Sequence, residues 1–114
     1  MNVGGIRMRV LDELRLLSQA SAQLDYEAAL SHGVGHATSE LIEGFCTDLY
    51  APKAPDFVGA FTEGELKSLA HLYGLMLEAR RSGHHAVGDL LKDPAWRRVI
   101  ALAKEIHVDF ARFA

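Results

Sequence analysis

Apolar residues recur with the 3.6-residue period of an α-helix along most of this chain, and no stretch alternates apolar and polar residues as a strand does. The period is clearest from residue 63 to residue 81. Its apolar positions are Leu66, Leu69, Ala70, Tyr73, Met76 and Leu77. Immediately before them, Thr62 and Glu65 have the spacing of a capping box, in which each side chain accepts a hydrogen bond from the other residue's backbone N–H. The sequence therefore fixes one helix start and predicts an all-α protein.

The same reasoning predicts four helices in one all-α domain that spans residues 1–114. The expected helices cover residues 6–30, 39–50, 63–81 and 94–113. Because the connections between them are modest, a small up-down-up-down four-helix bundle is the simplest arrangement. The main alternative is a rearranged helical fold in which the first helix is split at Asp25.

Glycine and proline mark the segments that we expect to lie outside the helices. Gly33 and Gly35 interrupt the chain after the first helix, and two Ala-Pro pairs indicate a loop over residues 51–61. Aromatic and aliphatic residues in and beside that loop are expected to anchor it in the core; they are Tyr50, Phe57, Val58 and Phe61. A short turn is expected at residues 86–91.

The composition is typical of a globular chain in water, since 49% of the residues are apolar, 24% are charged and the formal net charge is -3. No apolar run approaches the roughly 18 residues of a membrane span, so no membrane association is expected. Cys46 is the only cysteine, which excludes an intramolecular disulfide, and the first residues lack the pattern of a signal peptide. We therefore expect a protein of the reducing cytoplasm.

Acidic residues are concentrated in the middle of the chain. Residues 16–66 contain eight acidic residues and one base, Lys53, whereas residues 67–114 are net basic. The second expected helix and its flanking loops would therefore present an acidic surface that suits a basic partner protein. The residues expected to bind this partner are Glu40, Glu43, Asp48, Asp56 and Phe57. The alternative interpretation is a solvated helix face that binds nothing.

Six histidines are many for a chain of this length, and four of them lie in two turns that an up-down bundle brings to one end. With two neighbouring arginines, they form a candidate site for a metal or an anion; the set is His32, His36, His84, His85, Arg80 and Arg81. The chain has no Glu-x-x-His pair of the kind that bundle metal centres use, so no cofactor is expected. His71 and His107 are expected to be half-buried at the edge of the core.

Catalytic motifs are absent from the sequence. It contains no nucleophile elbow, no phosphate-binding loop and no dinucleotide fingerprint. Cys46 falls on the apolar face of an expected helix, where a thiol is inert. Nucleic-acid binding is not favoured either, because the chain is acidic and has no recognition-helix or zinc-finger pattern. These absences favour a non-enzymatic protein.

By its expected architecture alone, the chain is similar to the small acidic four-helix immunity proteins that neutralise bacterial toxins, although the sequence motifs of that family are not present. The likeness implies a protein whose acidic face binds and inhibits a basic partner. We therefore hypothesise a protein-binding module of a toxin-neutralising or otherwise inhibitory kind. Two alternatives remain, namely a metal- or anion-binding helical bundle that uses the loop histidines and self-association into a homodimer.

Overall fold

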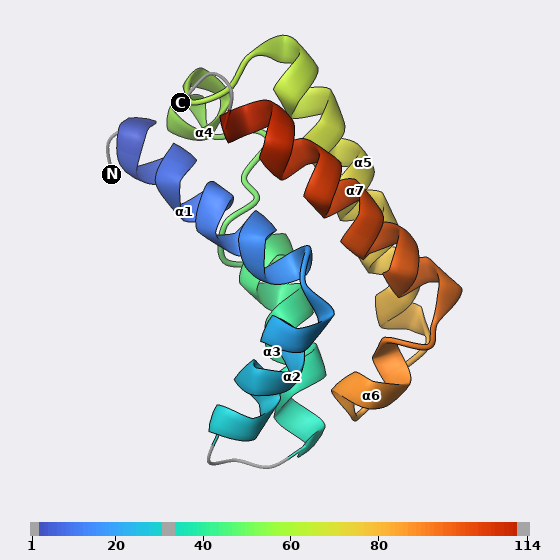
Figure 1. Cartoon of the computed structure of the whole chain (residues 1–114). Helices are drawn as coiled ribbons and strands as arrows, with labels where there is room; N and C mark the ends of the chain where they lie inside the picture. The colour runs from blue at the N-terminus through green and yellow to red at the C-terminus, as the bar shows by residue number, and fades with distance from the viewer. Residues whose placement is uncertain (1–2, 31–33, 112–114) are drawn as a thin grey trace.

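The computed structural model describes residues 3–30 and 34–111, which form seven helices and no strand (Figure 1). In chain order these are α1 (Val3–Leu17), α2 (Ala20–Ala29), α3 (Val34–Cys46), α4 (Pro55–Gly59), α5 (Glu63–Arg81), α6 (Val87–Leu90) and α7 (Pro94–Ala111). The prediction of an all-α protein is confirmed. The four-helix bundle is not confirmed, since this part of the chain forms seven helices rather than four. None of these helices is both long and apolar enough to cross a membrane.

Helix α5 begins and ends where the sequence predicts. The Thr62 hydroxyl accepts a hydrogen bond from the Glu65 backbone N–H at 3.1 Å, and the Glu65 carboxylate accepts one from the Thr62 backbone N–H at 2.8 Å. The capping box is thus confirmed. Beyond the end of α5, Gly83 has a φ of +65°, a left-handed conformation that glycine adopts without a steric penalty.

The first expected helix is two helices, and the break lies at Ser18 and Gln19 rather than at Asp25. The side chain of Gln23 explains its position. Its Nε2 donates hydrogen bonds at 3.2 and 3.0 Å to two backbone carbonyls at the end of α1. These carbonyls thereby obtain donors that a continuing helix would otherwise have to supply. Helix α1 also begins earlier than predicted, at Val3.

Two further helix boundaries differ from the predicted ones. Helix α3 begins and ends earlier than the predicted range 39–50, so that Gly35 lies inside a helix rather than in a loop. A glycine costs a helix only about 1 kcal/mol relative to alanine, which tertiary packing readily offsets. The turn expected at residues 86–91 is present as the short helix α6.

The segment 51–61, expected to be a loop, contains the short helix α4. Pro55 begins this helix at its first position, where a backbone N–H would have no partner within the helix, so the N–H that proline lacks is not needed. Phe57 and Phe61 are buried and anchor the segment in the core, as predicted. The same expectation is wrong for Val58, which is 40% exposed because it lies on the outer side of the single turn of α4.

The core lies between α7 and the helices that pack around it. Helix α7 contacts both α1 and α5, and Figure 1 shows it running alongside α5. Its buried face consists of Ala95, Trp96, Val99, Ala103, Ile106 and Phe110. Helix α3 packs against α1, α2 and α5, while α6 contacts α2 and α3. The arrangement leaves α1, α2 and α3 side by side. Most of the acidic residues discussed below come from these helices or from the turn after α3.

Arg7 connects α1 to the start of α5 and the end of α7. Its guanidinium forms two hydrogen bonds with the Glu65 carboxylate, at 2.8 and 2.7 Å, and donates another to the Ala60 carbonyl at 3.2 Å. It also lies 5.2 Å from the centre of the Phe110 ring. The hydrogen bond from Arg7 is the main cause that holds the pKa of Glu65 below its ordinary value. Glu65 therefore serves both the capping box and this ion pair.

Candidate protein-binding surface

A groove between α1, α2 and α3, which we call the acidic groove, gathers carboxylates from separate parts of the chain. Glu13 comes from α1, and Asp48 comes from the turn after α3. Glu40 and Glu43 both come from α3, where a spacing of three residues places them on one helix face. The groove has a volume of about 340 Å³. The structure thus brings three predicted partner-binding residues together and adds Glu13, which the charge pattern did not reveal.

Glu13 reaches into the acidic groove because the residue opposite it, Gly44, has no side chain. A Cβ atom on Gly44 would lie 3.1 Å from Oε1 of Glu13, closer than side-chain atoms normally pack. Burial raises the pKa of Glu13 to about 7, with a further contribution from the negative charge of Asp48, while the positive charge of Arg9 opposes the change. The charge of the groove therefore changes near neutral pH.

Tyr26 of α2 forms the outer wall of the acidic groove. Its hydroxyl donates a hydrogen bond to the Glu40 carboxylate at 2.8 Å. Burial, together with this bond, raises the pKa of Tyr26 to about 12, so the phenol remains a neutral donor. Because the donor is neutral, the bond orients Glu40 without cancelling its negative charge. Glu40 and Asp48 are both exposed, and a partner could reach either carboxylate.

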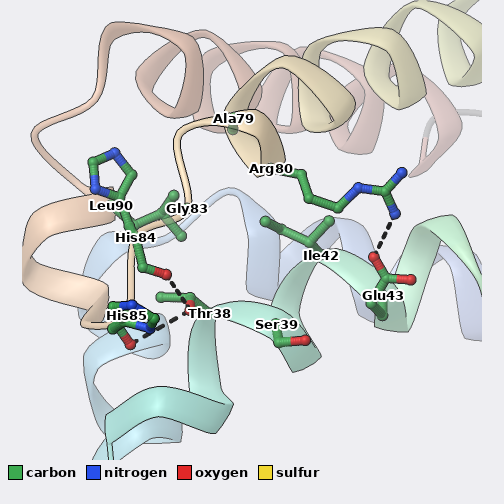
Figure 2. A pocket seen from close by; sticks show the side chains of 10 residues that line it. All are labelled: Thr38, Ser39, Ile42, Glu43, Ala79, Arg80, Gly83, His84, His85 and Leu90. Atoms are coloured by element: carbon green, nitrogen blue, oxygen red, sulfur yellow. Dashed lines mark hydrogen bonds and ion pairs between the residues drawn. The ribbon is translucent and has the colours of Figure 1, made fainter.

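Glu43 differs from the other acids of the groove because a base of the same chain compensates its charge. Arg80 of α5 lies 2.7 Å from the Glu43 carboxylate, and Figure 2 shows the arginine side chain reaching across to it. The Thr47 hydroxyl also donates to this carboxylate. The hydrogen bond from Thr47, followed by the one from Arg80, holds the pKa of Glu43 below its ordinary value. The accessible negative charge of the groove therefore comes mainly from Glu40 and Asp48.

A smaller hollow of about 170 Å³, which we call the apolar pocket, adjoins the acidic groove at Asp48. Asp56 lies at its rim and Phe57 in its wall. Phe57 is only 2% exposed, and its ring packs against those of Tyr50 and Phe61 with centroid distances of 5.6 and 5.0 Å. Phe57, one of the residues expected to bind the partner, is therefore not an exposed contact. It is a core residue that lines a pocket.

The turn after α5, which carries His84 and His85, lies against the start of α3. The Thr38 hydroxyl donates a hydrogen bond to the His84 carbonyl at 2.8 Å. Between α3 and this turn lies a hollow of about 270 Å³, which Figure 2 shows with the residues that line it. Ser39 and His85 are among the polar residues that line it.

Two of the basic side chains at this end of the protein pair with carboxylates of the same chain. Arg80 pairs with Glu43, and Nε2 of His84 lies 2.9 Å from the Asp93 carboxylate. A hydrogen bond from Ser82, followed by one from the backbone after Asp93, holds the pKa of Asp93 below its ordinary value, and His84 adds to the effect. Among the described members of the predicted set, Arg80, Arg81 and His85 are exposed, and Arg80 is already paired with Glu43.

The predicted metal ligands are described only in part. Among residues 3–30 and 34–111, no three side chains of His, Cys, Asp or Glu lie close enough together to hold a metal ion. His32 and the side chain of His36 lie outside the described residues. The metal hypothesis therefore receives no candidate centre from the residues that the structure describes.

The other two histidines and the only cysteine lie on α5, α7 and α3. His71, expected to be half-buried, is exposed because it lies on the solvent side of α5, whereas His107 is half-buried as predicted. Cys46 is also half-buried, and burial raises the pKa of its thiol to about 11. The thiol is therefore protonated near neutral pH and a poor nucleophile, as its place on an apolar helix face predicted.

Comparison with known proteins leaves the family open, since no family model, no curated protein and no solved structure matches this chain. The function is therefore inferred from the surface of the protein itself.

Proposed function

We propose that this protein is a non-enzymatic cytoplasmic binding module whose acidic groove docks a basic protein. The observation that supports the proposal is the convergence of Glu13, Glu40 and Asp48 in one groove, with two of these carboxylates exposed. A surface of one charge raises the rate at which a partner of opposite charge arrives, and it disfavours partners of the same charge. A groove also offers a shape that a protruding basic segment can enter.

Inhibition of a basic enzyme or toxin is the concrete form of this proposal. Enzymes that act on nucleic acids carry basic surfaces, since their affinity comes largely from contacts to phosphates. A small acidic protein that covers such a surface blocks the substrate without any chemistry of its own. The lack of catalytic motifs in the sequence supports the same interpretation.

Capture of the partner with matched charge variants tests the proposal. The groove variant carries Glu40→Lys and Asp48→Lys, and the control carries Glu105→Lys and Asp109→Lys, which make the same charge change on exposed residues of α7. We expect the wild type and the control to retain a basic partner that the groove variant loses. Raising the salt from about 0.05 M to about 0.3 M should weaken the retained complex, because salt screens exposed charges. Equal binding by all three proteins would contradict the proposal.

Anion binding is the second candidate function, and the hollow between α3 and the turn after α5 is the observation that favours it. Ser39, Arg80 and His85 line this hollow, and such groups bind phosphate or carboxylate. Thermal denaturation with sodium phosphate, against sodium chloride of equal ionic strength, tests this candidate. A phosphate-specific rise in Tm that Arg80→Gln abolishes would support it. Zinc and iron salts in the same assay, together with elemental analysis, test the metal form of the hypothesis.

A further inference from the structure

The apolar pocket beside the acidic groove has the size of one hydrophobic side chain. Five apolar residues line it, and they are Ile6, Leu49, Ala51, Ala54 and Phe57. They come from α1, from the chain after α3 and from α4. The volume of about 170 Å³ is close to that of the ~150 Å³ engineered cavity in a protein core that binds benzene. A leucine or phenylalanine side chain from another molecule therefore fits this pocket.

The rim of the apolar pocket has a net negative charge. Asp48 and Asp56 stand on it with one base, Arg9, and all three side chains are exposed. Asp48 also belongs to the acidic groove, so that the pocket and the groove form one continuous surface. A chain that inserts an apolar side chain here places its neighbouring residues beside carboxylates. Lysine or arginine suits those neighbouring positions better than any other residue type.

We propose that this pocket receives one leucine or phenylalanine side chain, which a basic segment of the partner presents next to lysine or arginine. The inference rests on the proposed function, because the acidic groove and the pocket engage the same partner. An apolar anchor that fills a pocket inside a polar rim is the usual arrangement of a binding hot spot. The charges mainly set the rate of association, whereas the seated anchor mainly sets the rate of dissociation.

The 2-phenylethylammonium ion is a suitable probe, since it combines an aromatic ring with a cation. Titration of the ¹⁵N-labelled protein, followed by amide chemical shifts, should give saturable changes at Leu49, Ala54 and Phe57. For so small a ligand we expect a Kd on the order of 1–10 mM. The neutral 2-phenylethanol should bind several-fold more weakly and phenylacetate more weakly still, because the rim carries two carboxylates and one guanidinium.

A variant that fills the apolar pocket supplies the control. Ala54→Leu places extra atoms in the pocket and should weaken probe binding at least ten-fold, while Ala101→Leu, on an exposed position of α7, should leave it unchanged. Circular dichroism establishes that both variants fold. Probe shifts that do not saturate in the wild type, or that persist unchanged in a folded Ala54→Leu variant, would overturn the anchor pocket.

The two proposals fail in different ways. Glu40 lines the groove but not the apolar pocket, so Glu40→Lys should leave probe binding intact while it weakens the complex with the partner. Probe binding without any effect of Glu40→Lys on the partner complex would contradict the acidic docking surface alone. Loss of the partner complex in Glu40→Lys, with no probe binding in the wild type, would contradict the anchor pocket alone.

Discussion

The buried side-chain amide of Gln23 accepts a hydrogen bond from the indole N–H of Trp96 at 2.8 Å and so joins α2 to α7 across the core. The same amide donates to carbonyls at the end of α1, so that one polar side chain satisfies groups of three helices. A buried polar group without a partner is costly, and here each one has a partner.

Replacement of this amide should destabilise the protein strongly. Gln23→Met keeps a similar volume but leaves the indole N–H and the Leu17 carbonyl without this partner, at a cost of about 2–4 kcal/mol. The Leu16 carbonyl keeps the Gln19 N–H. Urea unfolding, followed by the fluorescence of the single tryptophan, measures the free energy of unfolding. The control Gln19→Met, at an exposed site, should change it by less than about 0.5 kcal/mol. Equal stabilities for the two variants would contradict this role of Gln23.

The stability of the protein should fall as the pH rises toward neutrality because of Glu13. Burial raises the pKa of Glu13 from 4.5 to about 7, so the folded state holds this proton more tightly than the unfolded chain. The free energy of unfolding therefore decreases between about pH 4.5 and pH 7 and levels off above that range. Allowing for the partial exposure of Glu13, we expect a contribution of about 1–2 kcal/mol.

Glu13→Gln isolates this effect, since it removes the titrating group but keeps its shape. Between pH 5 and pH 8, the free energy of unfolding measured in urea should decrease less for the variant than for the wild type. At pH 8 the variant should be the more stable of the two. Asp12→Asn, on an exposed position of the same helix, is the matched control and should follow the wild-type profile. If the stability of Glu13→Gln depends on pH as that of the wild type does, another group causes the pH dependence.

Gly44→Ala should displace the Glu13 carboxylate toward water and return its pKa toward the ordinary value. The added Cβ would lie 3.1 Å from Glu13 Oε1, and the carboxylate at the end of a flexible side chain can move away. NMR titration of the Glu13 carboxyl carbon measures the pKa. Gly74→Ala in α5 is the control, because nothing lies within 4 Å of its new Cβ. It should stabilise the helix by about 1 kcal/mol without changing the Glu13 titration.

Loss of the Arg7 ion pair should destabilise the end of the protein where α1, α5 and α7 meet. The side chains of Arg7 and Glu65 are 20% and 11% exposed, so Arg7→Met leaves a largely buried carboxylate, at a cost of about 1–3 kcal/mol. Arg7→Lys keeps the charge but not the paired hydrogen bonds, so its stability should lie between that of the wild type and that of Arg7→Met. Urea unfolding ranks the variants, and Arg15→Met at an exposed site should match the wild type. A fully stable Arg7→Met variant would contradict the role of the pair.

Local signals predicted those parts of the fold that depend only on neighbouring residues. The capping box of Thr62 and Glu65 fixed the start of α5, because both of its hydrogen bonds lie within four residues. The division between α1 and α2 depends on Gln23, whose partner Trp96 is 73 residues away. The bonds from Gln23 to the end of α1 span only six and seven residues, but the bond that the same amide accepts comes from α7, and no local pattern contains that contact. A capping residue such as Asp25 is visible in sequence, which is why the sequence places the split there.

The residues of the candidate site were likewise predictable from the sequence only in part. Charge counting found Glu40, Glu43 and Asp48, because they lie together in an acidic stretch. It could not find Glu13, which joins them only when α1 packs on α3. Nor could it separate Glu43 from its neighbours, since Arg80 pairs with it from α5.

The close approach of Glu13 to Gly44 has a consequence for how this protein can evolve. A residue larger than alanine at position 44 would compete with a glutamate at position 13 for the same space, so the two positions constrain each other. Among chains that share this fold, we expect the two positions to covary, with a glycine or alanine at 44 wherever an acid is kept at 13. In a chain that combines a bulky residue at 44 with glutamate at 13, we expect the surface between α1 and α3 to have a different shape.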